Sequence, residues 1–301
     1  MFIFARHMYC WLIAAVVIVL TSQNAWAQSD VRPPLWEVRA GDTTAYLFGT
    51  IHVGAADFYP LPESVQSAFR NSDVLALEAD PNNSQQAASA LAIAMYAPPD
   101  SIEKHLEISL LSGVQEVSAL YGLQFQQLRQ MKPYLLMFML TMMEYGRLGY
   151  DAKYGLDAHF SQRALRDGKQ IIELESMSQQ MQMLDSLSPQ LQSAMLQITV
   201  DEILTGEVSV VSNEMIAAWS SGDTNQLNDV MTAEERKLAP PLAKEFRRRF
   251  LTDRNVAMAR RIDGMIKSGQ RVFVAVGALH MVGENSIPEM LREKGYTVRP
   301  L

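Results

Sequence analysis

Two stretches near opposite ends of the chain decide the fold: "YLFGTIHVG" at residues 46–54 and "FVAVGALHMVG" at residues 273–283. Each is an apolar run followed by Gly-x-x-His and a further glycine. The sequence of 301 residues contains only 5 histidines, so two of them in matching frames are informative. An apolar run that ends in glycine is typical of a buried strand followed by a turn. We therefore expect two strands that each deliver a histidine to a loop.

The residues around these stretches repeat one order of elements. "LWEVRA" and "AYLFGT" flank a Gly-Asp pair at residues 41–42, which is typical of a hairpin. After each Gly-x-x-His come a loop, a proline that opens a helix (Pro62 and Pro288), and another strand-like run. The sequence thus predicts two strand–Gly-x-x-His–helix–strand units, as in a distant internal duplication.

The middle of the chain, about residues 82–267, has a helical pattern interrupted by the strand-like "KQIIELES" at residues 169–176. Pro133 and Pro189 are expected first residues of helices, and Gly168 is an expected helix C-cap. We therefore predict an α/β fold. Both chain ends would form a central mixed sheet with helices on its faces, and a large helical insertion would lie between them.

The first 27 residues have the features of a secretory signal peptide. Arg6 precedes the apolar run "WLIAAVVIVL" at residues 11–20, and a small-x-small sequence ends at Ala27, where we expect cleavage. The apolar run is shorter than the roughly 20 residues of a transmembrane helix, so no membrane span is expected after cleavage. A retained anchor is the alternative. Residues 28–301 would then form a single domain that is periplasmic or secreted.

The composition excludes several classes of function. Cys10, the only cysteine, precedes the expected cleavage site, so the mature chain has no disulfide, thiolate metal site or cysteine nucleophile. A formal net charge of −7 and the lack of a Lys/Arg stripe argue against nucleic acid as a partner. The basic run "FRRRF" at residues 246–250 fits a solvated helix face. The 18 methionines, many at helical spacing, are interpreted as core packing.

Both motif histidines, His52 and His280, are expected at one edge of the sheet. Ligands bind to open α/β sheets beyond the carboxyl ends of the strands, which is where both motifs fall. One strand-end histidine is more often a satisfied polar residue, but two in matched frames favour a shared site. Glycines would allow the sharp turn after each strand, and the absence of a side chain would keep the space beside the following backbone open. These motif glycines are Gly49, Gly54, Gly277 and Gly283.

A carboxylate is expected beside the histidines. "VLAL" at residues 74–77 is typical of a buried strand, and Glu78 ends it at the same edge. An unpaired buried charge is costly, so Glu78 needs a partner; a salt bridge to a helix is the structural alternative. Two imidazoles and a carboxylate suit a divalent transition metal with positions open for water. The same groups could work without metal, one histidine activating water and the other, or an arginine, holding an oxyanion.

Taken together, these segments resemble the TraB/GumN family. The resemblance rests on "LWEVRAGDTTAYLFGTIHVG", "LALEAD", "YGLDAHF", "IIELES", Arg254-Asn255 and "VAVGALHMVG" followed by "LREKGYTVRP". It covers most of the mature chain in order and is strongest at the two ends. The superfamily also holds the Tiki metalloproteases, pheromone-shutdown proteins and, more remotely, erythromycin esterases and ChaN-like haem-binding proteins. The family's conserved positions fall on Gly49 and His52, Glu78, Arg254, and Gly277 and His280.

The resemblance implies a metal-dependent hydrolase, in the Tiki branch a peptidase that needs manganese or cobalt. On this interpretation His52, Glu78 and His280 bind one divalent ion, Mn²⁺, Co²⁺ or Zn²⁺, which activates a water molecule. The substrate would be a peptide or another small molecule with a hydrolysable bond.

Further site residues follow from the same resemblance. Arg254 would stabilise the oxyanion, although an ordinary surface ion pair is its alternative role. Asn255 accompanies it late in the helical pattern, just before the second motif strand. Glu175 or Asp157 would orient a histidine. His159 has a weaker case, because it could be only a surface helix residue.

Other functions remain open at this stage. The histidines could capture a small peptide or haem without any reaction, as in a periplasmic binding protein. A metal-independent, histidine-based esterase would also fit the sequence, and so would a structural accessory of envelope biogenesis. Glu78 favours hydrolysis over capture, because metal-activated water needs both ligand charge and a base.

Overall fold

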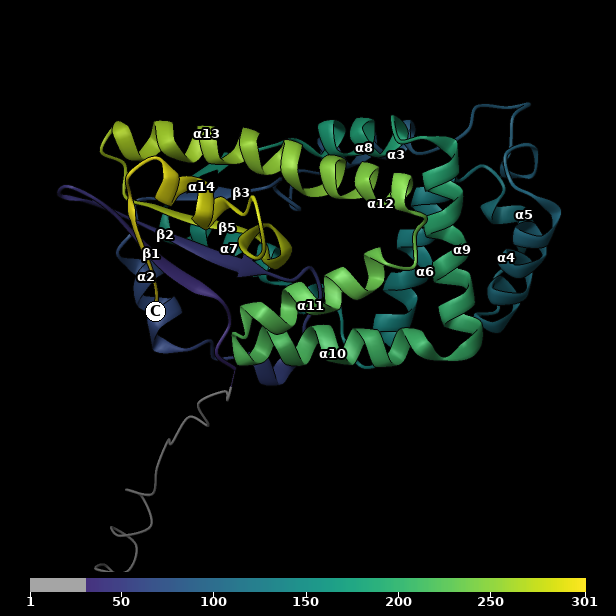
Figure 1. Ribbon diagram of the computed structural model, residues 1–301, viewed down its shortest axis with the longest axis horizontal. Coiled ribbons are helices and arrows are strands. Elements are labelled where there is room, and N and C mark those ends of the chain that lie inside the picture. The colour runs from purple at the N-terminus through teal and green to yellow at the C-terminus, as the bar shows by residue number, and fades with distance from the viewer. Residues whose placement is uncertain (1–30) are drawn as a thin grey trace, which may run out of the picture.

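The computed structural model describes residues 31–301, so the signal peptide predicted for residues 1–27 lies outside the described part. Figure 1 shows a sheet at one end of the molecule and a group of helices at the other. The sheet has the strand order β4-β3-β5-β2-β1-β6. Its strands are β1 (Leu35–Ala40), β2 (Thr43–Thr50), β3 (Val74–Leu77), β4 (Gln170–Glu173), β5 (Val272–Gly277) and β6 (Thr297–Pro300).

The sheet is mixed and is formed by both ends of the chain, as predicted. β2, β5, β3 and β4 are parallel neighbours, whereas β1 runs antiparallel to both β2 and β6. The C-terminal strand β5 therefore lies between β2 and β3 of the N-terminal part. The two strand–helix–strand units, β2–α2–β3 and β5–α14–β6, are interleaved in one sheet. Their helices are α2 (Glu63–Arg70) and α14 (Ile287–Glu293).

The predicted helical insertion is also present. Between β3 and β5 the chain is mainly helical apart from β4. Its helices are α3 (Ser84–Ile93), α4 (Ile108–Leu120), α5 (Phe125–Leu128), α6 (Pro133–Arg147), α7 (Leu156–Asp167), α8 (Met177–Asp185), α9 (Pro189–Thr205), α10 (Glu207–Ser221), α11 (Thr224–Glu235), α12 (Pro240–Phe246) and α13 (Asp253–Lys267).

Several helix ends follow from local sequence signals. Pro133 and Pro189 occupy the first turns of α6 and α9, where the missing N–H of proline costs no helical hydrogen bond. The side chain of Ser188 accepts a hydrogen bond from the backbone N–H of Leu191 and caps α9. Gly168 ends α7 in the left-handed conformation, with a φ of 67°. These ends confirm the boundaries predicted from the sequence.

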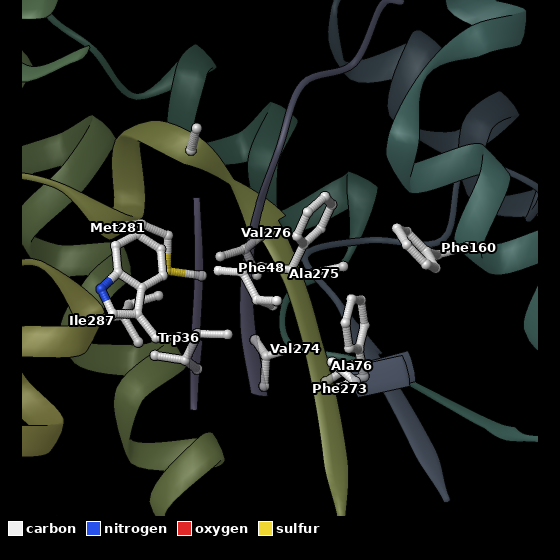
Figure 2. Packing of buried hydrophobic residues seen from close by; sticks show 14 of the residues in the cluster. Trp36, Phe48, Ala76, Phe160, Phe273, Val274, Ala275, Val276, Met281 and Ile287 are labelled. Atoms are coloured by element: carbon white, nitrogen blue, oxygen red, sulfur yellow. The ribbon is translucent and has the colours of Figure 1, made fainter. Parts of the chain in front are cut away.

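An aromatic cluster joins the two units of the sheet to α2 and α7. Phe48 on β2 and Phe273 on β5 have ring centroids 5.6 Å apart, and Phe160 of α7 lies 4.9 Å from Phe273. Phe69 of α2 completes the cluster at 5.1 Å from Phe160. Figure 2 shows part of this core, with Phe160 on one side of the strands and Trp36 on the other. Burial of these rings fixes the sheet against its helices.

The insertion has a hydrophobic core of its own, formed mainly by α4, α6 and α9. It reaches the sheet through a long helix, in which α12 and α13 are joined by a π-helical segment, Arg247–Thr252. In Figure 1 this helix runs along one side of the molecule from the insertion to the sheet. Within residues 31–301, no helix combines the length and apolar character needed to cross a membrane.

Candidate functional site

The two Gly-x-x-His motifs meet on neighbouring parallel strands. In the pairing of β2 with β5, Gly49 lies opposite Val276 and Thr50 opposite Gly277. Both motifs therefore leave the sheet at the same carboxyl edge. His280 follows β5 within a short 3-10 turn, Ala278–Met281. The shared edge expected from the sequence exists in the fold.

The motif glycines sit where other groups approach the backbone closely. A Cβ atom at Gly54 would overlap the carbonyl oxygen of Tyr154, so no side chain fits there without a shift of the backbone. Gly283 has a φ of +74°, which favours glycine. The carbonyl of Gly49 accepts a hydrogen bond from the indole nitrogen of Trp219 at 2.8 Å. The motifs thus fix the backbone on which the histidines stand.

Glu78 lies buried at the end of β3, between the second motif and α13. Its Oε1 accepts a hydrogen bond from the backbone N–H of Gly277 at 2.6 Å. Its Oε2 accepts one from Nη2 of Arg254 at 2.7 Å. Burial raises the pKa of Glu78, but the His280 cation present at low pH and Arg254 outweigh burial and lower the pKa to about 2. The carboxylate is therefore ionised at neutral pH.

Arg254 binds a second carboxylate, Glu175, at the same time. Its Nη2 is 2.7 Å and its Nε 3.0 Å from Oε2 of Glu175. Burial opposes its charge, but Glu78 and Glu175 raise the pKa of Arg254. The remaining nitrogen, Nη1, donates only to the carbonyl of Phe250, at 3.3 Å. One guanidinium thus faces two carboxylates, Glu78, which is buried, and Glu175, whose side chain is 12% exposed.

His280 is buried, and its two ring nitrogens have different surroundings. Nδ1 lies 2.5 Å from Oδ1 of Asn255, whose Nδ2 donates to the carbonyl of Asn285 at 2.8 Å. This second bond orients the amide so that its oxygen faces the ring, and Nδ1 therefore carries the proton. Burial lowers the pKa of His280 to about 4, although the carboxylate of Glu78 acts to raise it. The ring is therefore neutral at neutral pH. Nε2 then presents a lone pair 3.6 Å from Glu78 Oε1.

His52 is held in the same way by another acceptor. Its Nδ1 lies 2.9 Å from Oδ2 of Asp157, in the first turn of α7. Oδ1 of Asp157 accepts a hydrogen bond from the hydroxyl of Thr50 at 2.8 Å. The side chain of His52 is 69% exposed, and Asp157 raises its pKa. Its Nε2 is free to meet a ligand from solvent.

The candidate residues therefore form two contact networks at one edge of the sheet. Glu78, Glu175, Arg254, Asn255 and His280 form the buried network, and His52 forms the exposed one with Thr50 and Asp157. Among residues 31–301, no three His, Cys, Asp or Glu side chains lie close enough together to hold a metal ion.

Asp157, Glu175 and His159 differ in the residues that they contact. Asp157 contacts a histidine, as predicted for an orienting acid, whereas Glu175 contacts Arg254 instead. His159 lies in neither network; its ring packs at a tilt of 40° against Tyr59, with centroids 4.7 Å apart.

Two site residues did not emerge from the sequence. Thr50 lies inside the first motif, so its position two residues before His52 was a usable signal. Gln180 donates from Nε2 toward both Glu78 and Glu175, at 3.2 Å each. It belongs to an ordinary polar helical pattern, "SMSQQMQMLD", in which nothing distinguishes it.

Comparison with known proteins identifies the family of the chain. The sequence profile of the TraB/PrgY/gumN family matches residues 34–300. The chain belongs to this family. Among its relatives, the uncharacterized protein YbaP of Escherichia coli is 27% identical over 267 residues, which cover 89% of this chain and 92% of YbaP. No solved structure matches the chain.

Other relatives carry the name metalloprotease. Metalloprotease TIKI1 of Danio rerio is 24% identical over 314 residues, covering 90% of this chain and 63% of that protein. Metalloprotease TIKI1 of Homo sapiens is 23% identical over 315 residues, covering 90% of this chain and 62% of that protein. The TraB/PrgY/gumN chain described here thus has distant relatives named as hydrolases.

Proposed function

We propose that the chain is a metal-dependent hydrolase of peptide bonds. The observation that carries the proposal is the pair of lone-pair acceptors, Glu78 Oε1 and His280 Nε2, that face each other at 3.6 Å. The proton of His280 is on Nδ1, toward Asn255, so no hydrogen bond joins the pair. A cation between them would satisfy both, since metal bonds to imidazole nitrogen and carboxylate oxygen are about 2.0–2.2 Å long.

The chemistry of the donor set fits a divalent transition metal. Imidazoles bind such ions in their neutral form through one nitrogen while the other donates to a carboxylate or amide oxygen, and both His52 and His280 have such an acceptor at Nδ1. His280 is already neutral, whereas Asp157 raises the pKa of His52, so His52 would have to release a proton from Nε2 to bind the ion. Glu78 and Glu175 carry two negative charges, and Arg254 neutralises only one of them, so one negative charge remains. Glu78 and His280 would hold the ion from inside. His52 would be the third ligand, after its exposed ring turns toward them.

A bound ion would act as a Lewis acid and make its water ligand more acidic. The residues around the proposed ligands would have separate roles. Asp157 and Asn255 fix the tautomers of the histidines, and Arg254 holds the carboxylate of Glu78 in place. An oxyanion formed from the substrate would have to use Nη1 of Arg254, because Nε and Nη2 already donate to carboxylates.

The test is an assay of the full chain on a peptide library, with Mn²⁺, Co²⁺ or Zn²⁺ and after chelation. We expect cleavage that chelation abolishes and that re-added metal restores. His280→Ala and His52→Ala should each lower kcat/KM by roughly 100-fold or more, on the order of the loss from other catalytic groups. His105→Ala is the matched control, because His105 pairs with Asp100 in the insertion and should retain activity.

A metal-independent esterase is the second candidate, and the His52–Asp157 pair favours it. A histidine whose Nδ1 is held by a carboxylate and whose Nε2 is exposed has the arrangement of a general base. Activity that survives chelation but is lost in His52→Ala would select this mechanism and reject the metal. A chain without hydrolytic activity on any ester or peptide would favour a binding function.

We further propose that the reaction takes place outside the cytoplasm. The signal-peptide features of the first 27 residues support export. Fractionation of expressing cells, with mass determination of the product, tests this. We expect a periplasmic or secreted chain that begins at Gln28; a full-length cytoplasmic chain would contradict it.

A further inference from the structure

Gln180 lies between two carboxylates that come from different parts of the chain. Its Nε2 is 3.2 Å from Oε2 of Glu78 and 3.2 Å from Oε2 of Glu175. Gln180 belongs to α8, whose start is fixed by a capping box between Ser176 and Gln179. Because an amide nitrogen carries two hydrogens, Gln180 can donate one to each carboxylate.

The same two oxygen atoms also share a nitrogen of Arg254. Nη2 lies 2.7 Å from Oε2 of Glu78 and 2.7 Å from Oε2 of Glu175. Two like charges are therefore held side by side by two donors, in a place where water is largely excluded. Removing one donor from such a buried arrangement leaves acceptors less satisfied and strengthens their mutual repulsion. Arg254 alone would then have to hold both carboxylates.

The orientation of Glu78 decides what its other oxygen can do. Oε2 is held by Arg254 and Gln180, while Oε1 accepts from Gly277 and faces His280 Nε2 at 3.6 Å. A partial rotation of the carboxylate about its Cγ–Cδ bond would move Oε1 away from its place beside Gly277 and change its distance to His280. The donor on Gln180 opposes this rotation.

We infer that Gln180 is a positioning residue that keeps Oε1 of Glu78 directed at His280. The catalytic part of this inference rests on the proposed function, because Glu78 and His280 are the metal ligands proposed above. Gln180 does not contact the reacting atoms itself. It acts through Glu78, in the way that outer hydrogen-bond partners orient the ligands of a metal.

Three variants of the full chain separate positioning from packing. Gln180→Met keeps the length of the side chain and removes both donor hydrogens. Gln180→Glu keeps the shape and replaces the donor with a third carboxylate beside Glu78 and Glu175. Gln182→Met is the matched control, because Gln182 is an exposed residue of the same helix.

The first readout is kinetic. Gln180→Met should lower kcat about 10-fold or more with little change in KM, and Gln180→Glu should lower it at least as far, because loss of an outer partner typically costs roughly 10- to 100-fold. Gln182→Met should leave both constants unchanged. Full kcat in Gln180→Met, or an equal loss in Gln182→Met, would overturn the inference.

The second readout does not depend on activity. Crystal structures of the metal-free wild type and Gln180→Met should show a longer distance from Glu78 Oε1 to His280 Nε2 in the variant. An unmoved Glu78 would overturn the inference, whatever the wild type hydrolyses. A displaced Glu78 in the variant, together with a wild type that lacks metal-stimulated hydrolysis, would support the positioning role and reject the proposed function.

Discussion

His52 and His280 are fixed through the same ring atom but stand in opposite environments. Each directs Nδ1 to an oxygen acceptor, Asp157 in one case and Asn255 in the other. The first ring is largely exposed, whereas the second is buried beside Glu78. An anionic acceptor stabilises a positive ring more than an amide does. The repeated motif therefore supplies one ring that accepts a proton easily and one that stays neutral.

The backbone at Gly277 gives a test at the residue scale. A Cβ atom there would lie 3.0 Å from Oε1 of Glu78, although the φ of Gly277 is negative and suits any residue. We expect Gly277→Ala to push this carboxylate aside, to destabilise the fold by about 1–3 kcal/mol, as overpacking does, and to abolish most of the activity. Urea unfolding and the peptide assay measure the two effects.

Gly146→Ala is the control for this prediction. Gly146 lies on α6 with no atom within 4 Å of the added Cβ position. Alanine there should stabilise the fold by about 0.5–1 kcal/mol through helix propensity and leave activity unchanged. Wild-type stability and activity in Gly277→Ala would show that Glu78 tolerates the displacement.

Sequence reasoning reached most of the site residues but few of the contacts between them. Gly49, Gly277 and the two histidines are visible because their spacing repeats. The contact of Arg254 with Glu78 spans 176 positions and depends on where α13 crosses the edge of the sheet. No local pattern carries that information, and the same holds for Gln180, which looks like any polar helix residue.

At the scale of elements, α10 supports the first motif. Trp219 of this helix is fully buried and donates its indole N–H to the carbonyl of Gly49. Trp219→Phe should leave this carbonyl without a partner and cost about 1–3 kcal/mol of stability. Because Gly49 precedes His52, we also expect lower activity in the peptide assay. Trp36→Phe, a comparable loss of ring volume in the same core, should leave activity unchanged; equal activity losses would contradict the specific role of the bond.

An ion-pair cluster between α9, α10 and α11 predicts a pH dependence of stability. Lys237, just after α11, contacts Glu202 of α9 at 2.6 Å, Glu207 of α10 at 3.1 Å and Glu234 of α11 at 3.0 Å. Burial and the hydrogen bond to Glu234 raise the pKa of Glu202 to about 7. The folded state therefore holds this proton more tightly than the unfolded state does.

The sign of the effect follows from linkage. The stability contributed by protonated Glu202 is fully present below the ordinary pKa of 4.5 and is lost as pH rises through about 7. We expect the unfolding free energy of the wild type, relative to Glu202→Gln, to fall over this range by on the order of 2 kcal/mol. Urea unfolding of both proteins at several pH values measures the difference. A difference that stays constant with pH would contradict the prediction.

Elements with local signals could be predicted, and so could a mixed sheet formed by both chain ends, but the order of the strands in that sheet could not. Pro133, Pro189 and Gly168 mark helix ends because their effects act within one turn of the chain. The alternation of apolar runs likewise indicates the strands. The insertion of β5 between β2 and β3 depends on long-range pairing, for which the sequence has no local mark.

At the scale of the whole molecule, the site joins two separately packed parts. One core surrounds the sheet and the other lies within the helical insertion. Glu78, His52 and His280 come from the edge of the sheet. Gln180 and Arg254 come from α8 and α13, two helices of the insertion. Movement between the two parts would therefore change the distances within the site.

Metal binding should stabilise the whole fold. A ligand at about 100 times its dissociation constant adds about 2.7 kcal/mol to the unfolding free energy, which raises the Tm of a chain of this size by roughly 5 °C. We expect this shift with Mn²⁺ in the wild type and in His105→Ala, and its loss in His280→Ala. Differential scanning calorimetry measures it. A wild-type Tm that does not change when Mn²⁺ is added, or a Tm shift that persists in His280→Ala, would contradict the proposed metal site.

The position of β5 also sets the time at which the protein can become active. On the ribosome, β2 and β3 are made early, but they are not neighbours in the sheet and have no strand to pair with across the gap. Only when Val272–Gly277 emerge can the two be joined and the second histidine reach the first motif. If the chain is the hydrolase proposed above, it would therefore remain inactive until residues 272–283, which carry the second motif, have been made.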